Sequence, residues 1–210
     1  MATATLIPSS YYVSSSALSL SNEENMYTPV SSTTYGTVTN TNKSTSYYYF
    51  YLRGFNISDI PQNAQVSSFT VKIRGRASGA YNAALYLCHG TTTISNATAT
   101  QFPNSSSAST RTFANGSLTW ANIVSYGSDF GIRINCRRNA KNTQSYYYIY
   151  GAEIDVTYEV PAPASETIYF KKNGVWTAAS KAYKKVGGLW VEQTDLSNVF
   201  DLDTKYVKGN

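Results

Sequence analysis

The stretch Tyr146-Tyr147-Tyr148-Ile149-Tyr150-Gly151-Ala152-Glu153-Ile154-Asp155-Val156-Thr157-Tyr158 alternates between apolar and polar side chains along much of its length. One face of the resulting strand carries Tyr148, Tyr150, Ala152, Ile154, Val156 and Tyr158, and the other carries Glu153, Asp155 and Thr157. Successive side chains of a β-strand point to opposite faces of its sheet. The pattern therefore predicts a long strand with one buried and one wet face, which is typical of antiparallel sheets.

The same alternation recurs in two other stretches. In residues 66–76, one face carries Phe69, Val71 and Ile73, and the opposite face carries Thr70, Lys72, Arg74 and Arg76. In residues 130–137, one face carries Phe130, Ile132, Ile134 and Cys136, and the other carries Arg133, Asn135 and Arg137. Turn-forming residues separate further expected strands at about 11–20, 45–55, 80–88, 96–102 and 110–114.

The composition agrees with these strands, because the chain has 19 Tyr but only 2 Met among 210 residues, and aromatic side chains pack well on a pleated sheet. We therefore predict an all-β protein built on an antiparallel, jelly-roll-like β-sandwich. Residues 119–124 instead have apolar side chains at helical spacing, which predicts a short helix over one end of the sandwich. The Ser-, Thr- and Asn-rich stretches 21–44 and 89–109 are expected to contain long loops.

Proline and alanine alternate from Val160 to Ser165, a composition that favours an extended, semi-rigid linker. We therefore expect a β-sandwich over residues 1–160, a linker over 161–166 and a small C-terminal β-hairpin module over 167–210. The module contains two similar units, 170–176 and 183–190, each with an aromatic-Lys-Lys start, a glycine turn and a final tryptophan. Asn173-Gly174 and Gly187-Gly188 are typical hairpin turns, so two hairpins are expected, with Trp176 and Trp190 as a miniature core.

Charge and hydropathy narrow the class of partner. The formal net charge is +5, but only 14% of residues are charged, and Lys and Arg are scattered rather than gathered on one stripe. This distribution argues against nucleic-acid binding and is compatible with a mild attraction to anionic glycans. No apolar run approaches the length of a membrane span, and the start lacks the pattern of a secretory signal. We expect a protein made in a cytoplasm, with no membrane partner.

The ionisable residues do not form a recognisable catalytic or metal-binding motif. The single histidine, His89, follows Cys88, and neighbours in a strand point to opposite faces, so the two cannot form a nucleophile–base pair. The 12 acidic residues include no carboxylate embedded in an apolar run. We predict no enzymatic activity, no metal site and no cofactor. Cys88 and Cys136 are expected to be buried, reduced thiols, although the sequence leaves their pairing open.

Two aromatic runs, Tyr47–Tyr51 and Tyr146–Tyr150, allow two interpretations. Exposed tyrosines combine an apolar ring with a polar hydroxyl, which suits a sugar-stacking surface or a protein interface. Alternatively, both runs are neighbouring strands in the middle of a sheet whose outer face is partly covered, for example by a second copy of the chain. The candidate glycan or interface surface comprises Tyr47, Tyr49, Tyr51, Tyr146, Tyr147, Trp176 and Trp190.

The run from Tyr51 to Val66, with Phe55, Ser58, Ile60-Pro61, Ala64 and Val66 in fixed spacing before an alternating strand, resembles jelly-roll modules of phage structural proteins and bacterial surface proteins. Residues 118–122 and 150–158 share in this resemblance. The tail, with Lys171-Lys172-Asn173-Gly174-Val175-Trp176 and Trp190-Val191-Glu192-Gln193, is similar to terminal modules of minor structural proteins of phages that infect Gram-positive bacteria.

The resemblance implies a virion structural protein, either a head decoration or a head- or tail-fibre knob on the virion surface. Its implied partners are other capsid or tail proteins. The excess of tyrosine separately leads us to expect a homo-oligomer, with a trimer as one arrangement. The alternative is a carbohydrate-binding module that recognises a host-surface glycan during adsorption. The resemblance transfers no catalytic residue and does not distinguish head from tail.

Overall fold

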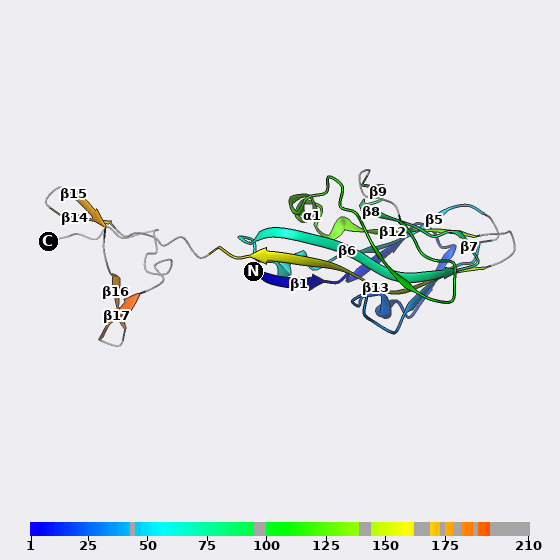
Figure 1. Ribbon diagram of the computed structural model, residues 1–210, viewed down its shortest axis with the longest axis horizontal. Coiled ribbons are helices and arrows are strands. Elements are labelled where there is room, and N and C mark those ends of the chain that lie inside the picture. Colours follow the sequence, from blue (N-terminus) through cyan, green and yellow to red (C-terminus); the bar gives the residue numbers. More distant parts are fainter. Residues whose placement is uncertain are drawn as a thin grey trace. The chain divides into compact units, whose positions relative to one another are not determined.

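The computed structural model of the chain describes residues 1–42, 45–94, 100–138, 144–161, 169–172, 175–178, 182–186 and 189–193. The chain forms two compact units, Met1–Val160 and Pro161–Asn210. The first unit is an antiparallel β-sandwich of two sheets, as predicted, with a single short α-helix among the described residues (Figure 1). No helix in this described part is long and apolar enough to cross a bilayer.

The first sheet, sheet A, has six strands centred on β13 (Ser145–Glu159). On one side β13 pairs with β6 (Gln65–Ser78), which in turn pairs with β11 (Ser109–Thr112). On the other side, two strands share the same edge of β13. The first half of β13 pairs with β4 (Gly36–Asn40), followed by β3 (Leu18–Ser21), and the second half pairs with β1 (Ala2–Leu6).

The second sheet, sheet B, has seven strands centred on β12 (Phe130–Arg138). Its main order is β10 (Thr100–Gln101), β8 (Ala84–His89), β12, β5 (Tyr48–Arg53) and β2 (Ser10–Val13). Two short strands complete it: β7 (Ala80–Asn82) pairs with the end of β12, and β9 (Thr92–Thr93) pairs with β8. The core lies between the two sheets.

The inward positions of the long strands form this core. Val71 and Ile73 of β6, and Ile132 and Ile134 of β12, have no exposed surface, as the alternation in the sequence predicted. Burial of such side chains stabilises each by about 1.5–3 kcal/mol relative to leaving it in water. The outward positions of the same strands are only partly buried, and they carry the polar and aromatic residues from which the candidate site is built.

The faces of β13 differ from the predicted ones because the strand contains a β-bulge. The register with β6 shifts between Ile149 and Gly151, so one residue is left over and the two halves of the strand present opposite parities to the core. Tyr147 and Ile149 are buried in the first half, and Ile154 is buried in the second. Tyr148 and Tyr150, predicted to share the apolar face of Ile154, therefore lie on the outer face of sheet A.

Several predicted boundaries also need correction. The single strand expected at 11–20 is two strands, β2 and β3, which belong to different sheets. The stretch 80–88 is divided between β7 and β8. Strand β4 lies within the stretch 21–44, for which only long loops were named, and β1 was not predicted. Both are short strands of five residues, so neither offers enough alternation to be recognised. Part of the strand expected at 96–102 falls outside the described residues.

The predicted short helix is present as α1 (Trp120–Tyr126). The Thr119 side chain accepts a hydrogen bond from the backbone N–H of Asn122, and the Asn122 side chain accepts one from the backbone N–H of Thr119, which closes a capping box. Single 3₁₀ turns occur as η1 (Glu23–Met26), η2 (Ile57–Asp59) and η3 (Gly127–Asp129).

In the described part of the second unit, β14 (Tyr169–Lys172) pairs with β15 (Val175–Ala178), and β16 (Ala182–Val186) pairs with β17 (Leu189–Gln193). These are the two predicted hairpins.

Candidate functional site

The two aromatic runs lie in different sheets. The first run contributes to β5 of sheet B, and the second forms the start of β13 in sheet A. The interpretation that they are neighbouring strands of one sheet is therefore wrong. Each run is instead close to the centre of its own sheet, and its outward tyrosines meet arginines from adjacent strands.

The outer face of sheet B carries a group of aromatic and cationic side chains that we call the tyrosine–arginine face. It comprises Tyr12, Tyr49, Tyr51, Arg53, Tyr86 and Arg133. Four of these residues form one row across four strands. Tyr12 of β2 is paired with Tyr51 of β5, Tyr51 with Arg133 of β12, and Arg133 with Tyr86 of β8. Antiparallel pairing thus brings residues distant in sequence into contact.

The two arginines of this face lie over tyrosine rings. The guanidinium carbon of Arg133 is 5.0 Å from the ring centre of Tyr49 and 4.6 Å from that of Tyr86. The guanidinium of Arg53 lies 5.2 Å from the Tyr12 ring and 4.8 Å from the Tyr51 ring. These separations are within the range of cation–π interactions. Each arginine lies over two rings, so its position is restricted by contacts with both of them.

Arg53 crosses the sheet because a glycine leaves space for it. A Cβ atom at Gly131 would lie 2.8 Å from the Arg53 Cγ, so a larger residue at this position on β12 would displace the arginine. The Arg53 side chain reaches the turn after β8 and donates a hydrogen bond from Nη2 to the Gly90 carbonyl oxygen at 2.5 Å. Its positive charge also acts on the thiol of Cys88, which is fully buried on the outer side of β8.

Burial is the main influence on the pKa values of Cys88 and Tyr51, which lie close to the two arginines. Desolvation raises the pKa of the Cys88 thiol to about 11, against the opposing effects of Arg53 and Arg133. Desolvation also raises the pKa of Tyr51, again against the two arginines, and this ring is only 2% exposed. Both groups are therefore neutral at physiological pH, and the positive charges of the face are not compensated from below.

The tyrosine–arginine face carries positive charges, and its own strands supply no negative charge. Strands β2, β5, β8 and β12 contain no aspartate or glutamate. Within the described residues, the Nε atoms of Arg53 and Arg133 are buried without a hydrogen-bond partner. The charge of Asp129 in η3 acts on the Cys88 thiol, where it opposes the effect of the two arginines. The face can therefore accept an anionic group from outside.

The outer face of sheet A has a similar composition but is partly covered by the chain itself. Arg74 and Arg76 lie over the rings of Tyr150 and Tyr148, at 5.0 and 3.6 Å. Tyr35 packs against both rings, with ring centres at 5.1 Å from Tyr150 and 5.3 Å from Tyr148. Its neighbouring segment also binds the sheet. Arg74 Nη1 donates to the Ser32 carbonyl oxygen at 2.9 Å, so this arginine is already occupied.

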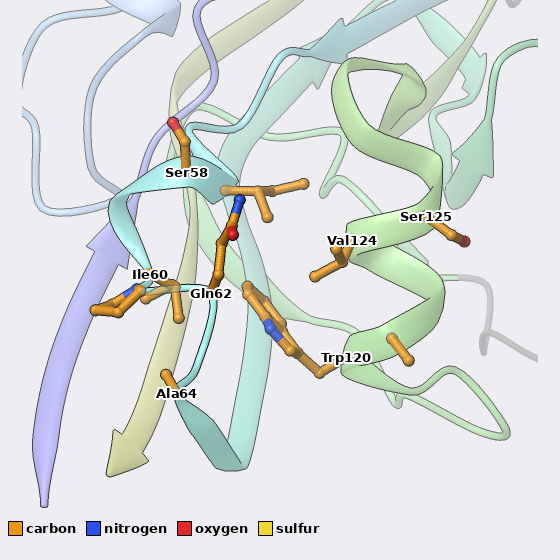
Figure 2. A pocket seen from close by; sticks show the side chains of 10 residues that line it. Ser58, Ile60, Gln62, Ala64, Trp120, Val124 and Ser125 are labelled. Atoms are coloured by element: carbon orange, nitrogen blue, oxygen red, sulfur yellow. The ribbon is translucent and has the colours of Figure 1, made fainter. Parts of the chain in front are cut away.

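An apolar groove of about 620 Å³ lies between helix α1 and the η2 turn. Figure 2 shows Trp120 and Val124 of α1 facing Gln62 and Ile60 across it. The Val124 side chain is 51% exposed, although it is apolar. The polar groups of the lining are uncharged and belong to Ser58, Gln62 and Ser125. An indole ring with hydroxyl and amide groups around it suits an uncharged ligand with both apolar and hydroxylated faces.

The ionisable groups elsewhere are engaged in structural contacts. Glu153 and Asp155 both bind Lys72, with the Lys72 Nζ 3.3 Å from the Glu153 Oε1. His89 stacks on Tyr126 of α1, with ring centres 4.3 Å apart. Cys88 and Cys136 are buried and not bonded to each other. In the part of the chain that the structure describes, no three His, Cys, Asp or Glu side chains are close enough to share a metal ion.

The residues predicted for a glycan or interface surface fall into separate places. Tyr49 and Tyr51 belong to the tyrosine–arginine face, and Tyr47 lies beside it, with its ring 4.8 Å from the Arg137 guanidinium. Tyr146 lies on the outer face of sheet A, stacked on Tyr148. Tyr147 is fully buried and donates a hydrogen bond to the Arg137 carbonyl oxygen, so it belongs to the core.

Trp176 and Trp190 lie in β15 and β17, paired with Lys171 and Lys185, and their side chains are outside the described part of the structure. Sequence reasoning missed four members of the tyrosine–arginine face, namely Tyr12, Arg53, Tyr86 and Arg133. The only signal for them was the outward parity of Arg133 in its predicted strand, because cross-strand pairing is not visible in a single sequence.

The fold and this face define a β-sandwich protein with an aromatic and cationic outer surface. The chain matches no protein-family profile, and no curated protein or solved structure is detectably similar to it.

Proposed function

We propose that the chain is a non-enzymatic virion surface protein, a decoration or fibre-knob protein of a phage head or tail. The observation that carries the proposal is the tyrosine–arginine face, a preorganised binding surface on a rigid sheet. Arg133 and Arg53 each lie over two rings there, while Glu153 and Asp155, two carboxylates on one strand, are both bound by Lys72. This arrangement suits binding better than acid–base chemistry.

The division of the chain into two units supports the same role. The sandwich ends at Val160, and the second unit contains two short hairpins with a Lys-Lys pair in each. Hairpins of four or five residues per strand bury little surface by themselves and gain stability by packing on another protein. We propose that the second unit attaches to a capsid or tail protein, and that the sandwich is displayed.

The direct test is the location of the chain in purified particles. Gold-labelled antibodies raised against residues 1–160 should decorate intact virions from the culture that encodes the chain, and mass spectrometry of those particles should detect its peptides. A chain found only in the soluble fraction of the lysate contradicts the proposal. The proposed homo-oligomer is tested separately, since a monomeric mass in solution at high protein concentration would argue against it.

The Trp120 groove favours a second candidate function, carbohydrate binding during adsorption to a host. Its uncharged lining fits a neutral sugar ring stacked on the Trp120 indole, with Gln62 and Ser125 near its hydroxyl groups. Binding of the full chain to an array of neutral glycans should be lost in Trp120→Ala and kept in Tyr12→Ala, which removes an aromatic ring from the other surface. Equal binding by both variants would argue against the groove as a sugar site.

A further inference from the structure

The outer faces of the two sheets differ in what already occupies their arginines. On sheet A, Arg74 donates to backbone carbonyl oxygens of residues 30 and 32, and Tyr35 packs on the tyrosines beneath. On sheet B, the described partners of the tyrosine–arginine face come only from its own strands and from the turn at Gly90. The outer face of sheet A also carries the carboxylates of Glu153 and Asp155, whereas the four strands that form the tyrosine–arginine face carry none.

The stacking leaves a particular part of each arginine for a ligand. The guanidinium carbon of Arg133 lies 5.0 Å from the ring centre of Tyr49 and 4.6 Å from that of Tyr86, and a ring contact of this kind does not use the N–H groups of the guanidinium as hydrogen-bond donors. These N–H groups form a planar fork that matches the two oxygens of a carboxylate or phosphate. The hydroxyl of Tyr12, whose side chain is 46% exposed, can donate a further hydrogen bond at the end of the same row.

From this geometry we infer that the tyrosine–arginine face binds an anionic polysaccharide or polyol phosphate, with its carboxylate or phosphodiester oxygens on Arg133 and Arg53. The inference rests on the proposed surface role and names its ligand class. The absence of acidic residues from β2, β5, β8 and β12 supplies the charge complementarity, because no carboxylate on these strands competes for the two arginines.

The ring faces distinguish this ligand from a single-stranded nucleic acid. Sequence-independent binding of bases requires open aromatic faces on which the bases can stack. Here Tyr51 is 2% exposed, and guanidinium groups lie over the rings of Tyr49, Tyr86 and Tyr12. The face presents N–H and O–H donors in place of open rings, which favours ligands rich in oxygen acceptors.

The test uses the full chain and four polymers of similar length: polygalacturonate, poly(glycerol phosphate), neutral dextran and oligo(dT). We expect binding to polygalacturonate or poly(glycerol phosphate) but not to dextran, weakening as NaCl rises. The first two polymers separate a carboxylate from a phosphodiester ligand. Binding to neither, or tighter binding to oligo(dT), would overturn the inference.

A matched pair of variants locates the site. Arg133→Gln should weaken binding about tenfold, since it removes a charge-assisted, two-pronged contact. Arg76→Gln removes the same charge from the outer face of sheet A and should leave the affinity unchanged. Equal losses in the two variants would show that only net charge matters, which contradicts a site on sheet B.

A measurement on the unmodified chain covers the case in which Arg133→Gln does not fold. The NMR signals of the Arg53 and Arg133 Nε–H groups should shift on titration with the bound polymer, whereas that of Arg76 should not. Shifts confined to Arg76 would refute the assignment. Because these experiments use isolated protein, their failure leaves the virion role intact. Absence of the chain from particles, in turn, would leave the polymer site intact.

Discussion

Arg138 at the end of β12 is one of the largest buried side chains of the sandwich and is only 2% exposed. Its Nε and Nη1 atoms are buried without a hydrogen-bond partner among the described residues. A buried charge without full hydrogen bonding costs free energy that an apolar side chain of similar length avoids. We therefore predict that Arg138→Met raises the free energy of unfolding by about 1–3 kcal/mol.

Urea denaturation of the variant and the parent chain at pH 7 measures this difference. The control is Arg111→Met on the edge strand β11, a residue that is only partly buried. Only its Nε atom is buried without a hydrogen-bond partner among the described residues, so its replacement should raise the free energy of unfolding by less, under about 1 kcal/mol. A loss of stability in Arg138→Met would show that the guanidinium makes favourable contacts in the folded chain.

Cys88 and Arg53 provide a second prediction for individual residues. The Cys88 thiol is fully buried on the outer side of β8, and Cys88 and Arg53 are both paired with Gly131 of β12, from opposite sides. Removal of this side chain in Arg53→Ala should expose the thiol, so that alkylation by iodoacetamide becomes at least about tenfold faster at pH 8. Cys136, which lies on the inner face of β12 and is also fully buried, should stay unreactive in both proteins. Mass spectrometry of the modified peptides distinguishes the two thiols, and equal protection of Cys88 in both proteins would show that Arg53 does not cover it.

At the scale of single elements, the bulge in β13 depends on Gly151. Its φ is +155°, and a Cβ atom there would lie 2.6 Å from the Pro29 carbonyl oxygen and even closer to that of Thr28. This close approach has a structural use, because the Ala152 N–H donates to the Thr28 carbonyl oxygen at 3.1 Å between the parts of β13 that pair with β4 and β1. Gly151→Ala should therefore lower the free energy of unfolding by at least about 2 kcal/mol.

Gly90 is the matched control for this prediction. Its φ is also positive, at +59°, but a Cβ atom there would meet no atom within 4 Å. Gly90→Ala should cost only the backbone strain of about 1 kcal/mol, without a steric clash. Denaturation curves of the two variants separate the contributions, and equal losses would mean that the crowding around Gly151 has no energetic effect.

The same elements show which features a single sequence reveals. Strand β6 was predicted almost completely, because its alternation runs unbroken from Phe69 to Arg76. The face of Tyr148 in β13 was predicted wrongly, because a bulge adds one residue without any change in the local pattern. The row from Tyr12 to Tyr86 was not predictable, since it depends on the pairing of four strands that are scattered along the chain.

For the whole sandwich, the two sheets bury a common core but treat their outer faces differently. The outer tyrosines of sheet A are partly covered by Tyr35 and its neighbours, whereas those of sheet B hold Arg53 and Arg133 in place. The excess of tyrosine in the composition therefore has two separate structural causes. Only the second lies on strands without a carboxylate, which is why the ligand proposal concerns sheet B alone.

The stability of the whole sandwich should also depend on pH in the alkaline range. Burial raises the pKa of the Cys88 thiol from 9.0 to about 11, and it raises the pKa values of Cys136, Tyr147 and Tyr51 as well. The folded chain thus keeps protons that the unfolded chain releases above pH 9, so stability is fully present below that pH and declines as the pH rises. Between pH 9 and 11, Cys88 alone should account for a loss of about 2–3 kcal/mol.

Urea denaturation at pH 7, 9, 10 and 11 measures this decline. The double variant Cys88→Ala, Cys136→Ala lacks both buried thiols and retains the two tyrosines, so its free energy of unfolding should fall less steeply between pH 9 and 10. The ordinary tyrosine pKa is 10.0, and the tyrosines therefore contribute chiefly above that pH. A decline of the same steepness in both proteins below pH 10 would show that the thiols are not the groups that link folding to proton release.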